Sequence, residues 1–202
     1  MDPNCPWNVA PVEPKGDEHR EGIYLAVGYA LSEWEGMEWR LMSLYSALLN
    51  SHTLGAQRGW GTLIAFAARL ELTREAELAF PGRDWPQFES LRETVRLAEK
   101  LSGRRNDIAH GHVVKVGGKN SGFYLCPSWY STTKFLGSKG MAGDSGLGKY
   151  AYTAAQIIKY GNHFAELTKT INRQNDEVVA AWAERPPKTH RWLTTEKWPD
   201  PQ

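Results

Sequence analysis

Residues 27–48 have the sequence VGYALSEWEGMEWRLMSLYSAL, and this stretch decides the fold class of the chain. Apolar side chains recur in it at steps of three and four residues, which places them on one stripe of an α-helix. The stripe consists of Val27, Ala30, Trp34, Met37, Leu41, Leu44 and Leu48. It lasts about six turns at 3.6 residues per turn, so we predict a long helix that begins near Arg20.

Glu38 lies at the margin of this stripe, next to Met37 and close to Leu41. A carboxylate in such a position either stays solvated at the rim of the core or points into a binding site. The solvated position is the more common one. We keep Glu38 as a candidate substrate-binding residue because the second interpretation stays open.

Three further segments show helical periodicity. A second helix is expected over 63–78, a third over 88–103, and a last long helix over 150–182. Residues 50–61 contain three glycines and predict a turn with a loose helix entry. Each apolar stripe needs a partner to cover it, so we expect a mainly α fold, an antiparallel four-helix-type bundle.

Local signals mark the ends of these helices. Asp84 offers an N-cap before the third helix, and Arg185-Pro186-Pro187 ends the last one. Between the third and last helices, Val113–Val116 and Phe123–Trp129 flank a glycine-containing turn, which predicts a β-hairpin or extended insertion over about 113–148. The end of that insertion, residues 137–148, holds five glycines and predicts a flexible linker.

The length of 202 residues suits one domain with its own core. Residues 1–19 contain four prolines and are expected to form an extended N-terminal lead-in. A single helical domain is expected over 20–185, followed by a Pro- and Trp-containing tail over 186–202.

Composition excludes several classes of function. Lys and Arg number 24 against 23 Asp and Glu, so no general positive field recruits nucleic acid or an anionic membrane. Cys5 and Cys126 indicate no disulfide framework, and neither they nor the histidines show the spacing of a metal site. No secretion signal or membrane-spanning stretch is evident, so we expect a cytoplasmic protein without a cofactor.

The densest group of chemically active side chains lies in residues 103–112, GRRNDIAHGH. Histidine exchanges protons near its usual pKa of about 6.5, and arginine binds phosphate oxygens in a fixed fork. Together these side chains suit phosphate-ester chemistry. On a continuous helix Asn106 and His110 share one face, whereas Arg105 and His110 differ by about 140° in azimuth. Convergence therefore needs a long arginine reach, a distorted helix end or a second subunit.

Arg105-Asn106 followed by His110-Gly111 resembles the signature of HEPN domains, an Arg and a His separated by four to six residues. The expected helices from about Arg20 to Trp182, with the motif at the end of the third, are similar to that family's arrangement. Many HEPN domains are metal-independent endoribonucleases that act as toxins or in antiviral defence. They form homodimers in which the two motifs face each other, whereas other members have lost catalysis.

The resemblance implies a role for each motif residue. His110 would transfer a proton during attack of the ribose 2′-hydroxyl, Arg105 would bind the scissile phosphate, and Asn106 would orient His110 or hold phosphate. The products would be a 2′,3′-cyclic phosphate, or its hydrolysis product, and a 5′-hydroxyl end. The implied partners are RNA, a second copy of the chain, and an antitoxin or regulatory protein.

Three neighbours of the motif are further candidates for substrate binding. Arg104 offers an extra phosphate contact, and His112 more simply begins the following strand. Asp107 either caps or pairs with an arginine, or it tunes His110. The insertion after the motif is longer than a simple four-helix member requires, and it could cover the cleft or bind a partner.

Other interpretations of the motif remain open. Arg105, Asn106 and His110 could form a buried polar network that ties the third helix to its neighbours, with Gly111 as the C-cap. The chain could also be a non-catalytic HEPN-like adaptor or an RNA- or nucleotide-binding regulatory module. The absence of metal spacing disfavours a metal hydrolase, and the absence of a basic recognition helix disfavours a transcription factor.

Overall fold

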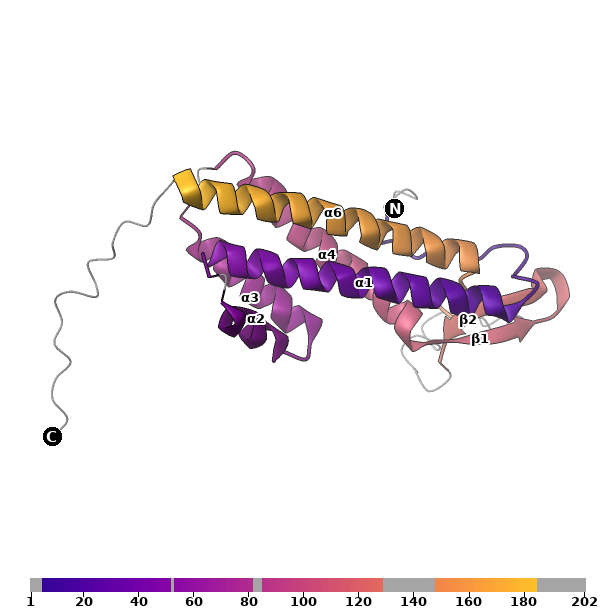
Figure 1. Ribbon diagram of the computed structural model, residues 1–202. Helices are drawn as coiled ribbons and strands as arrows, with labels where there is room; N and C mark the ends of the chain where they lie inside the picture. Colours follow the sequence, from indigo (N-terminus) through magenta and orange to yellow (C-terminus); the bar gives the residue numbers. More distant parts are fainter. Residues whose placement is uncertain (1–4, 52, 82–84, 129–147, 185–202) are drawn as a thin grey trace, which may run out of the picture.

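The computed structural model describes residues 5–51, 53–81, 85–128 and 148–184, and these ranges hold five helices and a two-stranded hairpin (Figure 1). The elements in chain order are α1 (Arg20–Leu48), α2 (Leu54–Gly61), α3 (Phe66–Ala79), α4 (Phe88–His110), β1 (Gly111–Val116), a 3-10 turn (Gly118–Asn120), β2 (Gly122–Pro127) and α6 (Ala154–Glu184). The expected mainly helical fold, with a hairpin before the last long helix, is confirmed.

The core forms around the stripe of α1. Trp34, Met37 and Leu41 are fully buried, and α6 packs along α1 for most of its length (Figure 1). Glycine at position 161 allows this approach, because a Cβ there would lie 3.2 Å from the Cα of Ala30. Near the far end, the Trp182 indole donates a hydrogen bond to the Ala47 carbonyl at 2.9 Å. The apolar stripe therefore has its main partner in the last helix of the chain.

Helix α2 lies where the sequence predicted a turn, and this prediction was wrong for residues 54–61. The Thr53 hydroxyl caps the helix by accepting from the Ala56 amide at 3.5 Å. Trp60 is buried, and its indole donates to the Thr73 hydroxyl at 3.2 Å. Burial of this one large side chain outweighs the poor helix propensity of three glycines.

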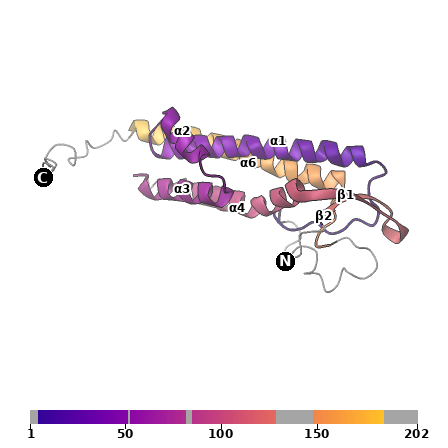
Figure 2. The same ribbon diagram turned by 90° about the horizontal axis from the view of Figure 1, so that it is seen from below.

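Because α2 leads the chain back along α1, α3 begins beside the middle of α1, where the Phe66 and Trp34 rings meet edge to face. The helix directions are therefore mixed rather than alternately antiparallel. In α1 and α6, residue 30 packs against residue 161 and residue 47 against residue 182, so these two helices run parallel. Helix α4 runs antiparallel to them (Figures 1 and 2).

The hairpin lies at the end of the bundle where α4 stops and α6 begins (Figure 2). Its strands are antiparallel, with Val113 opposite Leu125. Asp17 and Tyr152 bridge to the other edge of β2, at Phe123 and Leu125 respectively. The lead-in therefore packs against the hairpin as a third short strand segment, which leaves that edge of β2 covered.

The N-terminus of α6 is capped from two places in the sequence. Thr153 and Gln156 form a reciprocal capping box, with side-chain to backbone distances of 3.1 and 3.4 Å. The Asp17 carboxylate accepts from the Ala154 amide at 2.7 Å. A negative charge at this helix end also interacts favourably with the helix dipole.

Several expectations concern residues outside the described ranges. These are the N-cap at Asp84, the end of the predicted second strand at Trp129, most of the glycine-rich segment 137–148, and the tail 186–202. Within the described ranges, no helix has the length and apolar character needed to cross a membrane.

Candidate active site

Helix α4 continues without a break through the motif and ends at His110. The next residue, Gly111, is the C-cap, but its backbone is extended (φ −78°, ψ 163°) and not left-handed. A Cβ at Gly111 would lie 2.8 Å from Cγ of Leu125 and 3.0 Å from the Asp107 carbonyl oxygen. Glycine is required here because the end of α4 approaches β2 too closely for a side chain.

The unbroken helix sorts the motif into an inner and an outer face. Asp107 and Ile108 point inward and are 4% and 1% exposed. Asn106 and His110, four residues apart, are both exposed and share the outer face, as the spacing predicts for a continuous helix. The side chains of Asn106 and His110 therefore face solvent in a single copy of the chain.

The inner face forms a buried polar network. The Arg104 guanidinium lies 3.0 Å from the Asp107 carboxylate and donates to the Tyr152 hydroxyl at 2.8 Å. Tyr152 donates in turn to the Asp107 carboxylate at 3.3 Å, and Tyr150 donates to the Asp107 carbonyl at 2.8 Å. Of the two interpretations of Asp107, the arrangement matches pairing with an arginine. A buried network is present, but it does not consist of Arg105, Asn106 and His110.

Tyrosines extend this network to other elements. The rings of Tyr150 and Tyr152 stack with centroids 4.8 Å apart, and Tyr160 of α6 meets Tyr152 edge to face at 5.3 Å. Burial raises the pKa of all three phenols, so they stay neutral and donate hydrogen bonds. Tyr160 binds the carbonyl of Asn8 at 2.7 Å and the amide of Ala10 at 2.8 Å. The network thereby fixes the motif end of α4 to α6 and to the lead-in.

Arg105 occupies a position between the two faces. Its guanidinium lies over the Trp34 ring at 5.9 Å and 3.8 Å from the Glu35 carboxylate. Nη1 donates to the Asn106 side-chain oxygen at 3.3 Å. In the part of the chain that the structure describes, its buried Nε has no hydrogen-bond partner. The arginine is thus held next to Asn106 with part of its donor fork uncommitted.

Backbone contacts orient the His110 end of the motif. The Ser128 hydroxyl donates to the His110 carbonyl at 2.7 Å. His112, the candidate after the motif, is half-buried in β1 and pairs with Cys126 of β2. The hairpin therefore fixes the backbone on both sides of Gly111, while the His110 imidazole stays exposed.

Glu38 lies apart from the other candidates. Its carboxylate is 5% exposed, forms an ion pair with Arg69 of α3, and accepts a hydrogen bond from the Trp34 indole. Because Arg105 lies over the same indole, Glu38 is connected to the motif only through Trp34 among these contacts. The structure brings together Arg105, Asn106 and His110 on one region of α4, and places Arg104 and Asp107 beneath them.

Sequence reasoning missed the tyrosines that support the motif. The sequence predicted that the last helix begins near Tyr150, but α6 begins at Ala154, so Tyr150 and Tyr152 both precede it. Their spacing of two residues was an available signal, because alternate residues of an extended chain face the same side. The partner of that face, Asp107, could not be inferred from spacing.

No family model, curated protein or solved structure matches the chain. The resemblance to HEPN domains therefore rests on the motif residues and on the helical arrangement. Within the described ranges, no three His, Cys, Asp or Glu side chains gather in a way that could hold a metal ion.

Proposed function

We propose that the chain is a metal-independent endoribonuclease of HEPN type, with Arg105, Asn106 and His110 as its active-site residues. One observation carries the proposal: Asn106 and His110 share an exposed face of α4, and the Arg105 guanidinium is hydrogen-bonded to Asn106. A proton-transfer group, an amide and an arginine fork thus lie within two turns of one helix. This set of groups suits a phosphodiester.

In this proposal His110 takes the proton from a ribose 2′-hydroxyl. The 2′-oxygen then bonds to phosphorus, the bond from phosphorus to the 5′-oxygen breaks, and the 5′-oxygen receives a proton. Arg105 neutralises charge on the phosphate, and the Asn106 amide hydrogen-bonds to it or to His110. One imidazole cannot be base and acid at the same moment, so the second proton comes from the His110 of a second copy.

Apolar side chains exposed on α1 support such a homodimer. Leu25 and Trp39 lie on one face of α1 and are 77% and 55% exposed. Gly28 and Gly36 of the same helix are also uncovered, since a Cβ at either would meet no atom within 4 Å. Exposed apolar side chains of this size are typical of protein contact surfaces. In this proposal a second copy covers this side of α1, where Glu35 lies 3.8 Å from the Arg105 guanidinium.

Not every candidate is free to contact RNA. Arg104 is engaged by Asp107 and Tyr152, so in this proposal it supports α4 rather than binding phosphate. An enzyme of this kind would act in the cytoplasm as a toxin or antiviral defence effector, restrained by an antitoxin or regulatory partner.

The test compares wild type with His110→Ala and with His19→Ala, an exposed histidine outside the motif. Each protein is incubated in EDTA with end-labelled structured and unstructured RNAs, and the ends are analysed. We expect wild type and His19→Ala to cut, leaving cyclic-phosphate and 5′-hydroxyl ends, and His110→Ala to leave the RNA intact. Intact RNA with all three proteins would contradict the proposal.

A second candidate is a non-catalytic RNA- or nucleotide-binding module. The observation that favours it is the position of Arg105, whose guanidinium is held over Trp34 and near Glu35 instead of projecting freely. RNA binding by wild type without any cut product, weakened by Arg105→Ala, would support this candidate over the nuclease.

A further inference from the structure

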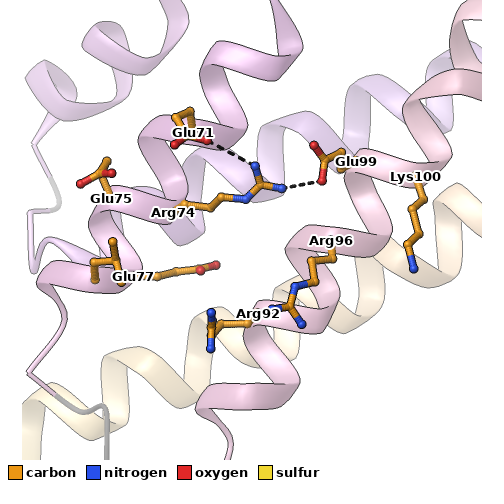
Figure 3. Close-up of a pocket in the computed structure, with 9 residues that line it drawn as sticks. Glu71, Arg74, Glu75, Glu77, Arg92, Arg96, Glu99 and Lys100 are labelled. Atoms are coloured by element: carbon orange, nitrogen blue, oxygen red, sulfur yellow. Dashed lines mark hydrogen bonds and ion pairs between the residues drawn. The ribbon is translucent and has the colours of Figure 1, made fainter.

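A polar cleft lies between α3 and α4 (Figure 3). Its volume is about 420 Å³, within the range of small-molecule sites. Arg92 at one end of the cleft and His110 are about 27 Å apart along α4, at 1.5 Å per residue. The proposed nuclease chemistry does not use this cleft.

Glu77 gives the cleft its unusual character. The residue is 4% exposed, and in the described part of the chain its buried Oε1 has no hydrogen-bond partner. Figure 3 shows its side chain extending from α3 into the space toward α4. Buried carboxylate oxygens nearly always have a hydrogen-bond donor, so this one lacks an interaction that an N–H group of a bound ligand could supply.

Two arginines of α4 line the same cleft. Arg92 and Arg96 are one helical turn apart and reach toward it from the side opposite Glu77 (Figure 3). Each forms an ion pair with a water-exposed glutamate of its own helix, Glu89 and Glu93 respectively. Exposed pairs of this kind are weak, so both guanidinium forks can turn to a stronger anion.

Arg74, Glu71 and Glu99 also line the cleft. Arg74 lies between Glu71 and Glu99, at 3.3 and 2.6 Å, and is therefore already neutralised. The cleft thus offers a hydrogen-bond acceptor on one side and two available cationic forks on the other. A matching ligand carries adjacent N–H donors at one end and an anion at the other.

Among nucleotides, guanine has this donor pattern. Its Watson–Crick edge carries two adjacent N–H donors, whereas the corresponding edges of adenine, cytosine and uracil place an acceptor beside each donor. A carboxylate accepts hydrogen bonds through both oxygens, and arginine forks bind phosphate. We propose that the α3–α4 cleft binds a guanine nucleotide, with Glu77 on the base and Arg92 and Arg96 on the phosphate.

The first test is calorimetric titration of the full wild-type chain with GMP, IMP, AMP and CMP. IMP differs from GMP only by the missing 2-amino group, so it removes one donor to Glu77. We expect GMP to bind, IMP to bind about tenfold more weakly, and AMP and CMP more weakly still. Equal affinity for the four nucleotides would overturn the proposal, and this arm needs no altered protein.

The second test uses variants. Glu77→Gln should weaken GMP binding at least tenfold. The double variant Arg92→Ala/Arg96→Ala should weaken GMP but leave guanosine, which has no phosphate, unchanged. The control is Arg173→Ala, an exposed arginine that is paired with a glutamate of its own helix, as Arg92 is. It should bind GMP like wild type, and unchanged GMP binding in Glu77→Gln would contradict the proposal.

A third arm distinguishes a free nucleotide from a guanosine within RNA. A short oligonucleotide with one guanosine is compared with GMP and with the same oligonucleotide carrying inosine. Tighter, guanosine-dependent binding of the oligonucleotide would identify RNA as the source, and GMP alone would identify the free nucleotide. No Glu77-dependent binding of either would overturn the inference. His110→Ala should bind GMP normally, so failure of the nuclease proposal leaves this one untouched.

Discussion

Two buried carboxylates, Asp107 of α4 and Glu77 of α3, lie in different surroundings. Next to the hairpin, Asp107 is contacted by the Arg104 guanidinium and the hydroxyls of Tyr150 and Tyr152. Next to α3, Glu77 is as deeply buried, but its Oε1 has no donor in the described part of the chain. Both carboxylates lie near arginines, and only the first is in direct contact with one.

This difference distinguishes a carboxylate that stabilises the fold, Asp107, from one that is available to a ligand, Glu77. Burial of a carboxylate is costly unless hydrogen bonds and a counter-charge compensate it. At Asp107 the compensation comes from within the chain, so the network stabilises the end of α4 and leaves the outward side chains to interact with other molecules. At Glu77 the compensation is incomplete, and a bound ligand would supply it. Three variants test this contrast, from the largest expected effect to the smallest.

Asp107→Ala should have the largest effect on the free energy of unfolding. It leaves the Arg104 guanidinium, whose side chain is 15% exposed, without its counter-charge. We expect a loss of about 3–5 kcal/mol in urea denaturation at pH 7. Glu99→Ala, which removes the exposed partner of Arg74, is the control and should cost less than about 1 kcal/mol. Equal losses in the two variants would show that the network is not a main support.

Glu77→Gln should have a smaller effect, and it should raise the free energy of unfolding. The size of this gain should depend on pH. Burial raises the pKa of Glu77 from its usual 4.5 to about 7, partly offset by Arg92, Arg74 and Arg96. The folded state therefore binds the proton more tightly than the unfolded state, and wild type loses stability as the pH rises from 4.5 to about 7. At roughly 1.4 kcal/mol per pKa unit, the full shift corresponds to about 3.5 kcal/mol, of which about 2.5 kcal/mol is lost between pH 5 and pH 8.

Glutamine does not ionise, so the variant should escape this loss. Urea denaturation gives the free energy of unfolding of the variant and of wild type at pH 5 and at pH 8. The variant should gain stability relative to wild type between the two pH values. Arginine side chains stay charged over this range, and Glu89, the other acidic group that acts on Glu77, is exposed and paired with Arg92. If the difference in stability between variant and wild type is the same at both pH values, other groups of the chain already compensate the buried charge of Glu77.

His110→Ala should have the smallest effect on stability. The imidazole is exposed, and the contact from Ser128 is to the backbone carbonyl, which alanine retains. We expect a change within about 0.5 kcal/mol in the same urea experiment. A loss of 2 kcal/mol or more would place His110 among the supporting residues and would weaken its assignment as a catalytic group.

The periodicity of apolar residues predicted the long helices. Each of these helices buries one face along its length, as Trp34 and Leu41 of α1 show, and a buried face needs apolar residues at helical spacing. Periodicity failed at α2, where the decisive contact is between Trp60 and Thr73 of the following helix. Glycines at 55, 59 and 61 indicated a turn, and a local pattern contains no information about such a tertiary contact.

The motif was found from sequence because its side chains are adjacent in the chain. The motif residues divide into an inner and an outer face because α4 continues to His110. The sequence did not show this, since Gly103 suggested that the helix ends before the motif. Glu77 could not have been found. A single glutamate among the polar residues of α3 resembles any solvated position, and only the packing of α4 over it makes it unusual.

The partner of α1 has a consequence for how the chain is made on the ribosome. The contacts that complete the core join residues far apart in sequence, such as Trp182 to Ala47, Asp17 to Ala154 and Tyr160 to Asn8. Helix α1 is translated before α6, which covers its apolar stripe and follows all the other described elements in the chain. In a nascent chain the apolar stripe of α1 therefore stays uncovered until α6 has been made. We expect chaperones that bind exposed apolar surfaces to bind α1 during this interval.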